Sequence, residues 1–164
     1  MGTLKEDIKT QSDWIVKAFN EDNLNLDYSI KSLVEIDKFF QLHSNNGQPI
    51  KGGRLSKNLG LICFSLASYI GETFIKNVPE STWKTDDEDP QGEFNLSIEL
   101  PNGTECFPAH RVMKRLKNGL EDGIYPYGHQ ITKDITGQEF DKSFWAIQET
   151  VKPLEPKKSF WKFW

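Results

Sequence analysis

The chain has 164 residues, a formal net charge of −4, and aromatic side chains at 12% of its positions. The acidic balance argues against general nucleic-acid binding, because neutralising phosphates requires a concentrated basic face. The content of large apolar side chains excludes a disordered chain, and the length suits one domain. We expect this domain over residues 1–152, followed by a tail rich in Pro, Lys and aromatic residues over 153–164.

The first ten residues lack the apolar core of a secretory signal, and Ser65, Ser68 and Glu72 interrupt the most apolar segment. We therefore expect a cytoplasmic protein without a transmembrane segment. Cys63 and Cys106 stand in apolar stretches without Cys-x-x-Cys spacing, which favours two reduced core cysteines. A disulfide between them would require a helix that lies directly on a strand.

Two amphipathic helices are predicted at the N-terminus. Thr3 and Glu6 have the spacing of a capping box, and the first helix ends near Asn20. The second begins at Asp27 or Ser29 and runs for about four turns.

The second helix ends at His43, where a positive charge would favour the helix dipole. Segment 44–54 contains three glycines around a proline but lacks the Lys and the Ser or Thr of a phosphate-binding loop. We expect a flexible connector here. Alternatively, Lys51, Arg54 and Lys57 meet an anion at the start of the next helix.

Residues 55–77 predict the longest and most apolar helix, around which we expect the rest of the chain to be organised. Its main apolar face has i, i+3, i+4, i+7 spacing, and Leu61, Phe64 and Ile75 form a second face. A helix with two apolar faces must be covered on two sides, so it should lie between layers.

The narrow polar stripe of this helix contains Ser65, Ser68, Glu72 and Lys76. Glu72 either pairs with Lys76 or anchors another segment through Arg111, Arg115 or an indole N–H group. A role as a catalytic acid or base would require a partner group that the sequence does not place.

Short strands are predicted after the central helix. Residues 82–85 around Trp83 form the first, and the acidic turn 86–90 that follows is either a solvated loop or a contact for a basic partner. This turn lacks the interleaved ligands and glycine bend that calcium requires.

Alternating apolar residues from Phe94 to Leu100 predict a strand with one buried face. The Pro-Asn-Gly turn at 101–103 then places Ile98 opposite Cys106. These elements together predict an α+β fold, with N-terminal helices and a buried central helix packed on a small antiparallel sheet, followed by further helices.

Pro108 begins another predicted helix, which Gly119 ends. Its exposed side is expected to carry Arg111, Lys114, Arg115 and Lys117. This basic cluster is either a solvated face or a contact for an acidic ligand or Glu72.

Residues 123–128 read as an aromatic loop that carries Tyr125 and Tyr127, and His129 follows. These side chains either line a ligand site or close the rim of the core. A last short helix is expected to begin near Asp141.

The C-terminal residues 160–164 include Trp161 and Trp164 among four aromatic side chains. If these side chains were exposed, they would form an apolar patch prone to association. The tail either folds into a groove of its own domain, or binds another chain or a neighbouring copy in self-association, or attaches to a membrane interface.

The Tyr69–Glu72 sequence, Trp83, Phe107-Pro108, Lys114-Arg115 and Gly119 together resemble a pattern found in small bacterial families of unknown function. In these, a helix with a Gly-Glu pair leads to a Trp-containing sheet and a Pro-started helix ending in Lys-Arg. The resemblance covers about residues 59–127. It implies a bacterial α+β protein without known catalytic residues.

The three histidines have no recognisable nucleophile or base partner in the sequence. We therefore expect a non-catalytic binding protein, such as an immunity or accessory protein of the kind that bacteria encode beside toxins. We expect a protein partner of basic character, and we expect no cofactor or metal. The alternative is a small-molecule-binding protein or a hydrolase-like enzyme that uses the region of Tyr125, His129 and His110.

Overall fold

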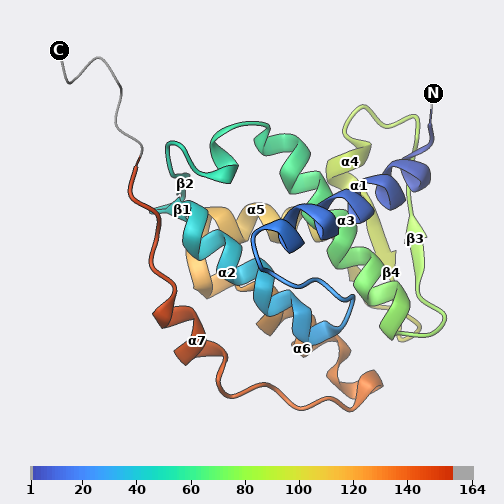
Figure 1. The fold of residues 1–164 in the computed structure, drawn as a ribbon. Coiled ribbons are helices and arrows are strands. Elements are labelled where there is room, and N and C mark those ends of the chain that lie inside the picture. The colour runs from blue at the N-terminus through green and yellow to red at the C-terminus, as the bar shows by residue number, and fades with distance from the viewer. Residues whose placement is uncertain (1, 157–164) are drawn as a thin grey trace.

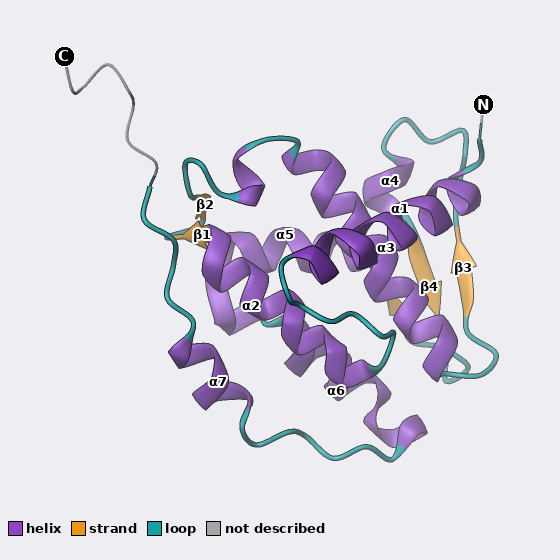
Figure 2. Ribbon diagram, in the orientation of Figure 1, coloured by secondary structure: helices purple, strands orange, loops and turns teal. Residues whose placement is uncertain are grey.

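The structure, a computed structural model, describes residues 2–156 and has the α+β fold predicted from the sequence (Figures 1 and 2). Its helices are α1 (Leu4–Glu21), α2 (Leu33–His43), α3 (Leu59–Asn77), α4 (Gly92–Asn95), α5 (Pro108–Asn118), α6 (Ile124–Thr136) and α7 (Phe144–Thr150). The strands are β1 (Ser44–Asn45), β2 (Gln48–Pro49), β3 (Thr82–Lys84), β4 (Ser97–Glu99) and β5 (Glu105–Cys106). Three 3₁₀ turns, η1 (Ile30–Ser32), η2 (Arg54–Ser56) and η3 (Gly119–Asp122), complete the described elements.

The first N-terminal helix begins as predicted, whereas the second begins at Leu33, after a 3₁₀ turn at the predicted start. Thr3 and Glu6 form the capping box of α1, with Thr3 Oγ1 accepting the backbone N–H of Glu6 at 3.2 Å. The Ser29 side chain caps the 3₁₀ turn η1, which leads directly into α2.

Helix α3 is the centre of the fold, as predicted, and α1 and α5 are the helices that pack most extensively against it (Figure 1). Strands β3 and β4 also contact α3, whereas α2 packs mainly against α6. We expected both N-terminal helices to cover α3, but of these two mainly α1 does so. Helix α5 packs on a second side of α3.

The predicted polar stripe of α3 is not solvent-exposed along its whole length. Ser65 and Ser68 are fully buried, and each hydroxyl donates to the carbonyl four residues earlier, at 2.8 Å. Leu61, expected on a covered apolar face, is 45% exposed. The Ser65 hydroxyl also lies 3.0 Å from Gln11 Oε1 of α1, so this small side chain faces the contact between α1 and α3.

Helix α3 is also long and apolar enough to cross a membrane by length and composition, and 67% of its most apolar window is buried inside the fold. Such burial is typical of a core helix. The main core cluster extends from Ile15 of α1 to Phe144 of α7.

Segment 44–54 is not the flexible connector that the sequence predicted. Strands β1 and β2 form a two-residue hairpin, with Ser44 opposite Pro49. At its tip Asn46 and Gly47 have φ of 54° and 77°, the left-handed conformations that Asn-Gly turns favour.

The three-stranded antiparallel sheet has the order β3-β4-β5, and its predicted register is confirmed. Ile98 lies opposite Cys106, and the backbone N–H of Leu100 donates to the Thr104 carbonyl at 2.8 Å. The strand prediction is wrong at its start, however, because Phe94 and Asn95 belong to the short helix α4.

Helix α5 begins at Pro108, and Gly119 caps it with φ 73°, as predicted. The aromatic loop predicted at 123–128 is wrong: these residues form the start of α6, where Pro126 lies in the first turn. Proline needs no hydrogen-bonded N–H there, so Pro126 permits a helix that its aromatic neighbours obscured in the sequence. Helix α7 follows the turn at Asp141 near the predicted position.

Candidate functional site

Arg115 is not on the exposed side of α5, where the sequence predicted it, but forms a buried ion pair with Asp37 of α2. Its Nε donates to Asp37 Oδ1 at 2.7 Å, and the two side chains are 1% and 0% exposed. Asp37 also accepts the backbone N–H groups of Ile124 and Tyr125, at 2.9 and 2.8 Å, at the start of α6. Burial raises the pKa of the Asp37 carboxyl, and the charge of Arg115 with the two N–H groups opposes that rise.

This network joins α2, α5 and α6 around one carboxylate. It satisfies the first N–H groups of α6, which an ordinary cap residue would otherwise have to bind. Arg115 is therefore a structural residue and has no exposed charge to offer a ligand.

Arg111 and Tyr127, both predicted binding residues, meet where α5 packs on α6. The Arg111 guanidinium carbon lies 4.1 Å from the centre of the Tyr127 ring, and Arg111 Nη1 pairs with Asp122 Oδ1 at 2.9 Å. Burial raises the pKa of the Tyr127 hydroxyl, which lies beside Cys106. The charge of Arg111 is thus largely used within the fold.

Tyr125 and His129 hold the segment after α6 against the core. The Tyr125 hydroxyl accepts the backbone N–H of Asp141 at 2.8 Å, and its ring packs 5.1 Å from that of Phe140. His129 Nε2 donates to the Gln138 carbonyl oxygen at 2.9 Å. Of the two interpretations of these side chains, the contacts favour the rim of the core over a ligand site.

Glu72 is half-buried on α3, and the predicted arginine anchors are engaged elsewhere, with Asp122 and Asp37. Lys76 lies over the Tyr28 ring, 4.9 Å from its centre, and no ion pair within residues 2–156 joins it to Glu72. The predicted partners of Glu72 are therefore wrong within residues 2–156. The Trp83 indole N–H, also considered, is buried without a hydrogen-bond partner in that part of the chain.

An aromatic cluster of Phe94, Phe107 and His110, which sequence reasoning missed, lies at the surface. The Phe94 and His110 rings stack with centroids 4.2 Å and planes 22° apart, and the Phe107 ring lies 5.1 Å from His110. Phe94 is 42% and Phe107 37% exposed. His110 Nε2 is buried without a hydrogen-bond partner among the residues that the structure describes.

The alternation of apolar residues had assigned Phe94 to the buried face of a strand. Helix α4 instead turns its ring outward, where it stacks on the first turn of α5. No local signal separates a strand from a helical turn here, because over only four residues the same apolar spacing is compatible with both.

Three aspartates of the acidic turn 86–90, called the acidic loop below, maintain its shape. Asp87 Oδ1 accepts the backbone N–H of Leu4 at 2.8 Å, which ties the loop to the start of α1. Asp89 accepts the N–H of Gln91 at 2.8 Å and the side-chain amide of Asn95 at 3.0 Å, and these bonds lower its pKa. Asp86 accepts the N–H two residues later at 3.0 Å.

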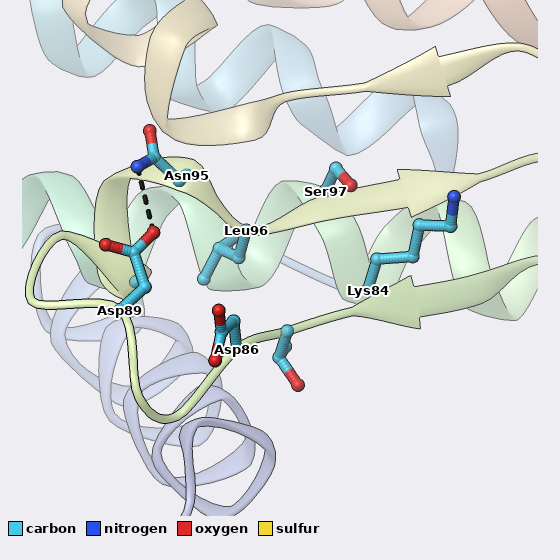
Figure 3. A pocket seen from close by; sticks show the side chains of 8 residues that line it. Lys84, Asp86, Asp89, Asn95, Leu96 and Ser97 are labelled. Atoms are coloured by element: carbon cyan, nitrogen blue, oxygen red, sulfur yellow. Dashed lines mark hydrogen bonds between the residues drawn. The ribbon is translucent and has the colours of Figure 1, made fainter.

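Two shallow hollows flank this loop and share Asp89 and Gly92. One, of about 220 Å³, lies between the loop and strands β3 and β4, and Figure 3 shows Lys84, Asp86 and Ser97 around it. The other, of about 350 Å³, is lined by Leu4, Asp87, Asp89, Pro90, Gln91, Gly92, Glu93 and Phe94. The second hollow therefore connects the acidic loop with the aromatic cluster.

Within residues 2–156, no group of three or more His, Cys, Asp or Glu side chains is arranged to hold a metal ion. Trp161 and Trp164 lie outside the described residues. The segment before them is attached to α2, since the backbone N–H of Leu154 donates to the Leu42 carbonyl at 2.9 Å.

Comparison of the chain with protein families, with curated proteins and with solved structures found no match. The resemblance to small bacterial families therefore stays a hypothesis.

Proposed function

We propose that this chain is a non-catalytic protein-binding protein whose acidic–aromatic surface, formed by Glu88, Glu93, Phe94, Phe107 and His110, binds a protein partner. The observation that carries the proposal is the half-exposed Phe94 ring stacked on His110 beside a hollow. Clustered aromatic side chains concentrate binding energy at protein interfaces, and contiguous exposed apolar patches are uncommon on surfaces that bind nothing.

The partner's contact surface is basic. Whereas the aspartates of the loop accept internal hydrogen bonds, the carboxylates of Glu88 and Glu93 are exposed and accept no hydrogen bond within residues 2–156. Their charges are available to steer and orient a cationic partner. An apolar side chain of that partner would then pack on Phe94 and desolvate the rim contacts.

An immunity-like or accessory role in the bacterial cytoplasm fits this proposal. Both cysteines are free and buried, which suits a reducing compartment. The enzymatic alternative has less support, because His110 lies in one aromatic cluster and Tyr125 with His129 in another.

Affinity purification with the tagged full chain tests the proposal, with captured proteins quantified by mass spectrometry and then purified for binding measurements. We expect one basic protein in stoichiometric amount. Phe94→Ala should weaken its binding about 30-fold, which corresponds to the loss of about 2 kcal/mol at an interface hot spot. Glu88→Gln with Glu93→Gln should slow association and reduce its salt dependence.

Trp145→Ala is the matched control, since this aromatic side chain is 48% exposed on α7, outside the proposed surface. It should leave binding unchanged. Equal affinity of the Phe94→Ala and Trp145→Ala variants for the partner would refute the proposal.

A further inference from the structure

We propose that His43 is a pH-sensitive latch that holds segment 50–56 closed against the end of α2 when the imidazole is neutral and releases it on protonation. The device is independent of the partner-binding surface, and it would couple the entry into α3 to acidification. Its evidence is the hydrogen bond that the ring accepts and the close packing around it.

The latch rests on one ring nitrogen. His43 Nδ1 accepts the backbone N–H of Arg54 at 3.1 Å, so this nitrogen carries no proton and Nε2 does. If Nδ1 were protonated, its N–H group would face the backbone N–H of Arg54, and two donors cannot form a hydrogen bond. Protonation therefore removes the bond and does not merely weaken it.

The surroundings leave the ring little room to adjust. His43 is 7% exposed, its ring centroid lies 4.7 Å from that of Phe39, and a Cβ at Gly53 would come within 3.1 Å of Nδ1. The His43 carbonyl also accepts the backbone N–H of Ile50 at 2.9 Å. Segment 50–56 thus packs against the imidazole through Gly53 and Arg54, and it leaves the ring largely buried.

Two charged groups of neighbouring elements act on the ring in opposite directions. Asp22, which follows α1, favours the imidazolium, and the Arg54 guanidinium disfavours it. These two groups neutralise each other through a paired contact, with Nε and NH2 of Arg54 at 3.1 and 2.8 Å from the carboxylate oxygens. The carbonyl end of α2 also favours a cation, but burial dominates and lowers the pKa of His43 below its ordinary 6.5.

The sign of the pH dependence follows from this direction. The closed segment binds a proton less readily than the open or unfolded chain, so the stabilisation of the closed segment is fully present above about pH 6.5. Closure is lost as the pH falls through the folded-state pKa. The sequence had placed His43 as a helix-end cation, and the structure makes it a neutral acceptor.

The test is an NMR titration of the ¹⁵N-labelled full chain between neutral pH and about pH 5, the range in which histidine titrates. The ring nitrogens should report an unprotonated Nδ1 at neutral pH. The amide exchange rate of Arg54, corrected for the intrinsic effect of pH, should rise about fivefold as His43 titrates. That factor corresponds to the loss of one hydrogen bond of about 1 kcal/mol.

His43→Gln keeps an acceptor but cannot titrate, so its Arg54 exchange should not depend on pH after correction. His129→Gln is the matched control and should behave like the wild type. A protonated Nδ1 at neutral pH, or an Arg54 exchange rate that does not follow the titration of His43 in the wild-type chain, would overturn the proposal without any variant. Equal pH dependence in the His43→Gln chain would do the same.

Discussion

The Trp83 indole lies directly against the backbone of Gly71, where any side chain would collide with it. A Cβ at position 71 would stand 2.0 Å from Trp83 Cη2 and 2.8 Å from Ile98 Cδ1. Strand β3 therefore packs on α3 through a face that contains no side chain at this position. Gly71 and Trp83, which both belong to the pattern noted in the sequence, therefore contact each other directly.

Gly71→Ala should lower the free energy of unfolding by about 1–3 kcal/mol, the usual cost of overpacking a close contact. The rigid indole and the buried Ile98 cannot both move away. Urea denaturation followed by Trp fluorescence measures the loss.

Gly60→Ala on the same helix is the matched control, because a Cβ there meets nothing within 4 Å. It should be neutral or stabilise the protein by up to about 1 kcal/mol, as alanine does in helices. Similar losses for both variants would show that helix backbone effects, and not the indole contact, decide the outcome.

The Asp37–Arg115 pair predicts a large loss when one partner is removed. Arg115→Met should cost about 3–5 kcal/mol of stability, since it leaves a buried carboxylate without its cation. Arg111→Met removes the less buried pair with Asp122, in which the side chains are 20% and 23% exposed, and should cost about 1 kcal/mol or less.

The double variant Asp37→Leu with Arg115→Met should be more stable than the sum of its single changes predicts, because no unpaired buried charge remains. Some loss persists, since the first N–H groups of α6 lose their acceptor. Additive losses in the denaturation cycle would contradict a direct ion pair.

The two thiols should be unreactive in the folded protein. Burial raises the pKa of Cys63 to about 11 and also raises that of Cys106, so the nucleophilic thiolate is scarce at neutral pH. Mass spectrometry after iodoacetamide treatment should find both unmodified in buffer and both alkylated in denaturant. Rapid labelling of Cys63 under native conditions would mean that α3 opens locally.

Local rules in the sequence anticipated the elements that depend on near neighbours. The capping box of Thr3 and Glu6, the register that pairs Ile98 with Cys106, and Gly119 at the end of α5 are all confirmed. Each depends on hydrogen bonds or backbone conformations within a few residues, which sequence spacing specifies directly.

The sequence patterns also predicted the wrong secondary structure for short segments whose pattern is ambiguous. Phe94 has the spacing of a strand yet lies on a single helical turn. Tyr125 lies in a helix whose Gly and Pro residues had indicated a loop. Side chains were also placed wrongly for a different reason. Arg115 has a charge that predicts exposure, and only the distant Asp37 makes its burial favourable.

The amino-acid sequence by itself therefore determined the α+β class, the central helix α3 and the ends of most helices, because periodicity and capping are local properties. Only the tertiary structure decided which ionisable and aromatic groups meet: Arg115 with Asp37, Phe94 with His110, and His43 with the Arg54 backbone. These partners are 78, 16 and 11 residues apart in the chain. Whether a charge is buried or an aromatic ring exposed depends on such distant partners, and no local pattern encodes them.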